Sequence, residues 1–293
     1  MTPDFLIIGA MKAGTSTLRD HLRVSRDVFV VPQELHYFSD DAVFARGPEW
    51  YRTQFAGAGG AGAIGEKTAS YCSSEKAARR IREHLPDVKL IWLFREPVAR
   101  CYSHYWHSVQ RGREPLRFAD AVRAEQYLVS GDRERTYLRR SRYSEQVESY
   151  LELFPREQLF FVLFEEMVKQ PAVALERVFR FLEVPLRDFE PATRHSHPTY
   201  GPRNPRVQWL TARLFGRGDR GWNVMQRINR RKRPGYPPMD DRLRAELREH
   251  FSDYNRKLGV LTGLDVSPWS ASSPASEPRI DVGVVAATSE AVR

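Results

Sequence analysis

Apolar residues along the chain gather in short continuous runs separated by stretches with helical spacing. The strongest runs cover residues 5–8, 88–94 and 159–164, and a weaker one covers 63–66. Runs of this length, apolar on both faces, are typical of strands buried in a parallel sheet. Strands that alternate with helices favour an α/β fold with right-handed crossovers. The pattern therefore predicts a central parallel β-sheet flanked by helices.

The stretches between the runs predict several amphipathic helices. Ser74 is placed to cap one of them, and Pro97 occupies a first-turn position of a helix that reaches Gln110. Three more stripes recur at helical spacing: Tyr143, Val147, Tyr150, Leu151 and Phe154; Leu175, Val178, Phe179 and Leu182; and Leu243, Leu247, Phe251, Tyr254 and Leu258. We interpret these stripes as core positions and not as cofactor sites.

Composition shifts divide the chain into one domain and a tail. Residues 1–269 are expected to form a single domain, within which the Gly/Ala-rich stretch 56–62 predicts a loop. Residues 194–238 are rich in Arg, Pro and Gly and predict an irregular excursion with a short helix near 207–214. Residues 270–293, rich in Ser, Ala and Pro, are expected to be a disordered tail.

The first apolar run leads into a loop that contains two glycines, Gly9 and Gly14, and then into the start of a helix. This order predicts a P-loop-like phosphate cradle, because loop N–H groups and a helix N-terminus both attract anions. The P-loop of ATPases carries a lysine directly after its last glycine. Here Thr15 holds that position and the lysine comes earlier, at Lys12. The loop should bind a phosphate-like group, and the misplaced lysine argues against ATP or GTP hydrolysis.

A second candidate anion site follows the run 88–94. Arg95 comes at the carboxyl end of that predicted strand, where ligands of α/β sheets bind. Ser103 follows eight residues later, inside the next helix. The two side chains can converge on one phosphate, although an ordinary strand-to-helix turn with a surface arginine explains the same residues.

Together these two motifs resemble the sulfotransferases that use 3′-phosphoadenosine 5′-phosphosulfate, and among them the heparan-sulfate branch. Segments 32–39, 65–71 and 261–269 extend the resemblance over residues 3 to about 269. It implies the sulfotransferase fold and transfer of a sulfuryl group to a hydroxyl or amine. Residues 12–17 would hold the 5′-phosphosulfate, namely Lys12, Ala13, Gly14, Thr15, Ser16 and Thr17. Arg95 and Ser103 would bind the 3′-phosphate, and Arg203 falls in a loop that closes over it in the family.

The resemblance also implies catalytic roles. Lys12 would neutralise charge on the bridging oxygen, and Lys67 matches a lysine near the sulfuryl group and the acceptor. Glu34 matches the catalytic base of the branch. His36 competes for that role because histidine titrates near neutrality, and the alternative role for it is an acceptor contact. With lysines in place of Mg²⁺, no metal is required.

Charge and cysteine content narrow the other possibilities. The formal net charge is +9, from 46 Lys and Arg against 37 Asp and Glu, which suits a polyanionic partner. A nucleotide kinase or NTPase and a basic nucleic-acid-binding protein remain the alternatives, although we expect no nucleic acid. Cys72 and Cys101 give no disulfide framework, and the pair His195 and His197 is weak evidence for a metal.

No apolar run approaches the roughly 20 residues that span a membrane, and no basic leader precedes the first run. The sequence therefore favours a soluble, cytoplasmic, bacterial enzyme. A carbohydrate, a glycolipid or a secondary metabolite could be its acceptor. The sequence leaves the oligomeric state open.

Overall fold

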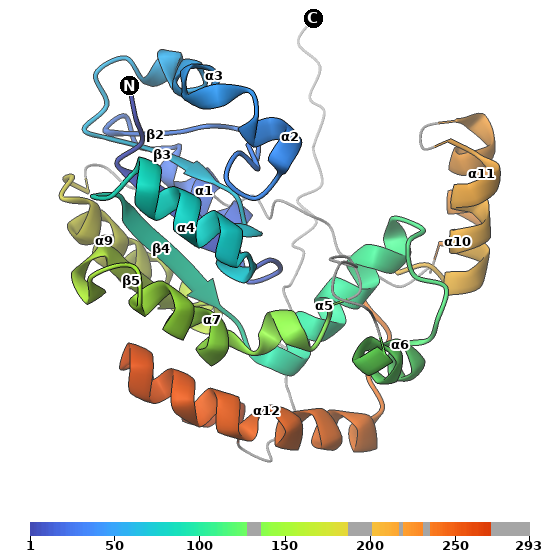
Figure 1. Ribbon diagram of the computed structural model, residues 1–293. Helices are drawn as coiled ribbons and strands as arrows, with labels where there is room; N and C mark the ends of the chain where they lie inside the picture. The colour runs from blue at the N-terminus through green and yellow to red at the C-terminus, as the bar shows by residue number, and fades with distance from the viewer. Residues whose placement is uncertain (128–135, 187–200, 217–218, 231–234, 271–293) are drawn as a thin grey trace, which may run out of the picture.

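A five-stranded parallel sheet forms the centre of the molecule. The computed structural model describes residues 1–127, 136–186, 201–216, 219–230 and 235–270. The strand order is β2-β3-β1-β4-β5. Figure 1 shows the sheet with helices packed around it. The strands are β1 (Phe5–Gly9), β2 (Val28–Val30), β3 (Ala63–Lys67), β4 (Lys89–Phe94) and β5 (Leu159–Leu163). All neighbouring pairs in this sheet are parallel, which confirms the predicted α/β architecture.

Four of the five strands coincide with the predicted apolar runs, and β2 does not. It has only three residues, too few for a recognisable pattern, and it exists because Val28 and Val30 pair with Ala63 and Gly65 of β3. β3 also extends one residue beyond its predicted end. Lys67 therefore belongs to the strand, which is why its side chain has a fixed position at the carboxyl edge of the sheet.

The principal helices follow the predicted stripes. They are α1 (Thr15–Leu22), α4 (Glu75–His84), α5 (Pro97–Gln110), α7 (Tyr143–Leu151), α9 (Pro171–Leu182) and α12 (Asp241–Thr262). Ser74 caps α4, as predicted: its Oγ accepts a hydrogen bond of 3.2 Å from the N–H of Ala77. Short helices complete the described chain, among them α2 (Asp41–Phe44), α3 (Gly47–Thr53), α6 (Phe118–Ala124) and α8 (Phe164–Lys169).

The segment 194–238 is more regular than expected. The short helix predicted near 207–214 is present as α10 (Pro205–Leu214). A second helix, α11 (Arg220–Asn229), contradicts the irregular excursion. The glycines and arginines around this helix made its amphipathic pattern hard to recognise in the sequence. In the structure its buried residues are Trp222 and Asn229. A short 3₁₀ turn, Ala56–Ala58, likewise begins the predicted loop 56–62.

Several predictions fall on parts of the chain that the structure does not describe. His195 and His197 lie outside the described residues, as does the predicted tail from residue 271 onward. Within the described ranges, every helix is too short or too polar to traverse a lipid bilayer.

Candidate functional site

The loop between β1 and α1, called here the anion loop (residues 9–17), lies at the carboxyl edge of the sheet. It is fixed to β4 because the N–H of Ala10 donates to Leu93 O at 2.7 Å. Gly14 has φ 88° and caps α1. A Cβ at this position would lie 2.7 Å from the Phe164 ring, so glycine is required both by the left-handed backbone and by the close approach.

Lys12 stands at the tip of this loop in an unusual electrostatic position. Its φ of 70° lies in the left-handed region, which costs a non-glycine residue roughly 1 kcal/mol or more. Burial and the nearby guanidinium groups of Arg95, Arg111 and Arg100 lower the pKa of Lys12 to about 8. Positive charge is thus concentrated around Lys12, and an anion bound there would relieve the repulsion.

Two arginines, Arg95 just after β4 and Arg100 on α5, contact the anion loop from the β4 side. Arg95 Nη1 donates to the carbonyl oxygen of Lys12 at 3.4 Å, and Arg100 Nη1 reaches that of Met11 at 3.5 Å. The structure therefore brings Lys12 and Arg95 to one place, as a single nucleotide with phosphates at both ends would require. Sequence reasoning missed Arg100, which is fully buried in α5, and Arg111, just beyond it.

On the β3 side, four of the predicted residues meet. Lys67, almost fully buried, forms a close ion pair with Glu34 Oε1 and donates to Ser16 Oγ at 3.3 Å. The other carboxylate oxygen of Glu34 lies 3.3 Å from His36 Nε2. Lys67 ends β3, Glu34 and His36 follow β2, and Ser16 begins α1. Three separate segments thus place a carboxylate, an imidazole, an ammonium group and a hydroxyl beside the anion loop.

A buried carboxylate that the sequence analysis did not single out supports this group. Glu66 is fully buried and accepts hydrogen bonds from three hydroxyls: those of Tyr51 and Tyr71 at 2.9 Å each, and that of Thr68 at 2.8 Å. Thr68 Oγ1 in turn accepts from the N–H groups of Leu35 and His36, at 3.2 and 3.3 Å. This chain of contacts positions the 34–36 segment, where His36 has the left-handed φ of 53°. The sequence did offer one signal for Glu66, since it is a glutamate inside a predicted apolar strand.

Burial dominates the electrostatics of Glu66. It raises the pKa of Glu66 to about 7, although the hydrogen bonds from Thr68, Tyr71 and Tyr51 act in the opposite direction. The carboxyl is therefore poised to change protonation near neutral pH, beneath residues that are candidates for proton transfer.

The positions of the remaining predicted residues give less information about their roles. Ala13 and Thr15 are buried within the anion loop, and Thr17 is half-buried on α1. Ser103 is buried on α5, one turn beyond Arg100. Arg203 is exposed, and its N–H donates to Asn229 O at 2.6 Å, so it belongs to the α10–α11 hairpin. The roles of these five residues stay predictions.

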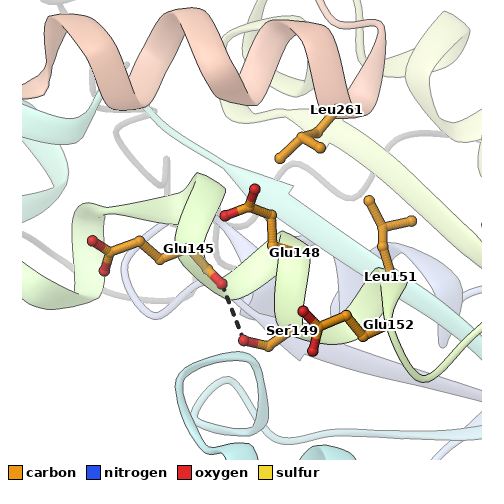
Figure 2. A pocket seen from close by; sticks show the side chains of 6 residues that line it. All are labelled: Glu145, Glu148, Ser149, Leu151, Glu152 and Leu261. Carbon is orange, nitrogen blue, oxygen red and sulfur yellow. Dashed lines mark hydrogen bonds between the residues drawn. The ribbon is translucent and has the colours of Figure 1, made fainter.

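A shallow hollow elsewhere on the surface has the wrong charge for an anionic ligand. It lies between α7 and α12 and is lined by Glu145, Glu148, Ser149, Leu151, Glu152 and Leu261 (Figure 2). Lys257 of α12 is paired with Glu148 at 2.6 Å. Three carboxylates in one hollow repel phosphate or sulfate, so the anion loop remains the candidate site.

Comparison with known proteins identifies the family of the chain. A family model described as the sulfotransferase domain matches residues 2–201. The human heparan sulfate glucosamine 3-O-sulfotransferase 6 is 29% identical over 264 residues, which cover 90% of this chain and 72% of that protein. The mouse heparan sulfate glucosamine 3-O-sulfotransferase 5 is 26% identical, with coverage of 89% and 72%.

A solved structure is similar in fold as well as in sequence. The crystal structure of a sulfotransferase from Alicyclobacillus acidocaldarius matches with a TM-score of 0.72 and 26% identity, over 92% of this chain and 100% of that one. Because the domain model also covers more than half of the sequence, the chain belongs to the sulfotransferase family, with the heparan-sulfate branch among its relatives.

Proposed function

We propose that this sulfotransferase moves the sulfuryl group of 3′-phosphoadenosine 5′-phosphosulfate to a hydroxyl, or an amine, of a carbohydrate-type acceptor. The observation that carries the proposal is the position of Lys67, which contacts both Glu34 and Ser16. This one side chain links a carboxylate able to accept a proton to the loop that would hold the donor. A glycolipid or a secondary metabolite with a free hydroxyl is an acceptor of the same chemistry.

The residues around the anion loop fit the donor. Ser16, Thr17 and the loop N–H groups would bind the 5′-phosphate at the start of α1. Arg95 and Ser103 would bind the 3′-phosphate, as the family resemblance implies. The contact of the Arg95 guanidinium with the Lys12 carbonyl supports a place for Arg95 beside the donor. Burial and, after it, the surrounding arginines lower the pKa of Lys12. The arginine contribution supports the same assignment, since positive charge that disfavours a free ammonium group favours a polyanion.

The relatives support the proposed acceptor class. Those named above are glucosamine 3-O-sulfotransferases, which by their names sulfate a sugar hydroxyl. The exposed imidazole of His36, next to Glu34, is suited to contact a polar acceptor. We therefore place the acceptor hydroxyl on the side of the 34–36 segment and the donor on the side of α1.

In this arrangement Glu34 takes the proton of the acceptor hydroxyl while that oxygen forms its bond to sulfur. The bond between sulfur and the bridging phosphate oxygen breaks on the opposite side, and the electron pair stays on that oxygen. Lys12 and Lys67 neutralise the charge that develops there, which is the main requirement of this kind of transfer. Donor binding gives Lys67 a second anionic partner and loosens its hold on Glu34.

The test combines donor binding and transfer. We expect 3′,5′-bisphosphoadenosine to raise the melting temperature, as a ligand of the folded state must. We also expect label from the ³⁵S-labelled donor to appear on glucosamine-containing oligosaccharides in an acceptor screen. Mg²⁺-dependent phosphate release from ATP without binding of the bisphosphate would instead indicate an NTPase. Salt-sensitive DNA or RNA binding that the bisphosphate does not affect would indicate a nucleic-acid-binding protein.

A further inference from the structure

The α10–α11 hairpin exposes an unusual number of large apolar side chains. Figure 1 shows the hairpin at the side of the molecule, away from the sheet. Its exposed apolar residues are Leu210, Leu214, Phe215, Val224 and Ile228. Leu214 and Ile228 keep 66% and 62% of their surface accessible. An apolar group of this size on one substructure is typical of an interaction surface.

Arginine alternates with these apolar positions in the same way on both helices. α10 carries Arg206, Leu210, Arg213 and Leu214, and α11 carries Arg220, Val224, Arg227 and Ile228, so each helix repeats the same spacing. At 100° per residue, these four positions share one face. The opposite faces are buried: Gln208 of α10 donates to Gln110 O of α5 at 3.1 Å, and Trp222 of α11 is buried.

We propose that this hairpin docks on the surface of a lipid bilayer that contains anionic lipids. A helix face with apolar side chains between arginines suits the bilayer interface, where the apolar groups enter the acyl boundary and the guanidinium groups meet phosphates. Neither helix contains an acidic residue, and all four arginines are exposed. The binding is peripheral, since the hairpin lies on the bilayer and does not cross it.

Other occupants fit this face less well. A second copy of the chain would bring the same arginines together, and like charges in contact oppose association. A nucleic acid would satisfy the arginines and leave Leu214, Ile228 and their apolar neighbours in water. A bilayer interface satisfies both kinds of side chain at once, and the inference does not depend on the identity of the sulfuryl acceptor.

The experiment is co-sedimentation of the full chain with vesicles of phosphatidylglycerol and phosphatidylcholine, and with vesicles of phosphatidylcholine alone. We expect binding to the anionic vesicles that weakens with salt. Replacing two matched apolar residues, L214S with I228S, should lower the partition at least about tenfold, because buried apolar area contributes most of the interfacial affinity. Replacing two matched arginines, R206Q with R220Q, should lower it about 25-fold, since each contributes roughly fivefold near an anionic surface.

Matched control variants lie on other faces. V173S with V260S removes two exposed apolar side chains, and R79Q with R242Q removes two exposed arginines. Both should bind vesicles like the parent, and all variants should keep the melting temperature and its rise with 3′,5′-bisphosphoadenosine.

Three results would overturn the inference. One is a parent protein that stays in the supernatant with anionic vesicles. The second is vesicle binding that survives L214S with I228S, which would show simple charge attraction. The third is concentration-dependent dimer formation, or nucleic-acid binding, that these variants abolish while vesicles have no effect.

Discussion

The two sides of the anion loop differ in how they arrange charge. On the β3 side, Lys67 is paired with Glu34, and a buried carboxylate beneath them accepts three hydrogen bonds. On the β4 side, burial and the charges of the surrounding arginines lower the pKa of Lys12. The charges on the β3 side are therefore balanced without a ligand, and the β4 side carries an excess of positive charge.

This difference separates two tasks that the proposed reaction combines. An excess of positive charge binds a polyanion through long-range attraction and needs no single fixed geometry. Proton transfer requires a base held within hydrogen-bond reach of the reacting group, and on the β3 side the contacts with Lys67 and His36 hold the Glu34 carboxylate in place. Substitutions on the β3 side should therefore affect turnover and pH dependence. Substitutions on the β4 side should affect nucleotide affinity, and at Lys12 also turnover, because Lys12 is proposed to neutralise charge on the bridging oxygen.

The largest effect is expected at Glu34. Replacing Glu34 with Gln removes the proton acceptor and should lower kcat by about 100- to 10,000-fold, the usual contribution of a positioned base. The affinity for 3′,5′-bisphosphoadenosine, measured by calorimetry, should not fall, because Lys67 is then free for the ligand. His36→Ala is the matched comparison: a greater loss of kcat there than in Glu34→Gln would assign the base to His36.

Glu66 should control the pH dependence of stability. Burial raises its folded-state pKa to about 7, above the 4.5 of an unperturbed glutamate, so the folded state binds the extra proton between these pH values. Its contribution to the free energy of unfolding is then fully present below pH 4.5 and is lost as pH rises through 7. Glu66→Gln cannot titrate and should gain about 3 kcal/mol relative to the parent over that range. Urea unfolding at several pH values measures this, and parallel curves for both proteins would contradict it.

On the β4 side, Arg95→Ala should weaken binding of 3′,5′-bisphosphoadenosine by about 10- to 100-fold, as the loss of a charge-assisted hydrogen bond does. Turnover at saturating donor should change much less. Arg79→Ala, an exposed arginine of α4, is the matched control and should bind normally. Equal binding by Arg95→Ala and the parent would remove Arg95 from the donor site.

The smallest effect concerns pH and Lys12. With a pKa of about 8, Lys12 is charged below that pH, and bound phosphate should raise its pKa. The affinity for 3′,5′-bisphosphoadenosine should therefore be level below pH 8 and fall by up to about tenfold per pH unit above it. Lys12→Met should bind more weakly and without this dependence. A parent affinity that is constant from pH 7 to pH 9.5 would contradict the assignment.

The sequence by itself determined the parts that depend on local pattern. Continuous apolar runs identified four strands, because a strand that is buried on both faces needs apolar residues at consecutive positions. The two-glycine loop before α1 and Arg95 after β4 were placed at the carboxyl edge of the sheet because each directly follows a predicted strand. Glu34 and Lys67 were named only through the family resemblance, since a loop glutamate or a strand-end lysine has no local signature. His36 was named because it lies two residues from Glu34 and histidine titrates near neutrality.

The tertiary structure decided which of these residues meet. Glu34 and Lys67 are 33 positions apart and form a pair because β2, β3 and β1 lie side by side in that order. The pairing of β1 with β4 brings Arg100 and Arg111, on and just after α5, near Lys12. The folded chain also gives Glu66 three hydroxyl partners, which are Tyr51, Tyr71 and Thr68. The periodicity of apolar residues indicates whether a residue is buried. Its neighbours across the sheet depend on the order of the strands, and the sequence does not specify that order when the strands are connected by helical crossovers.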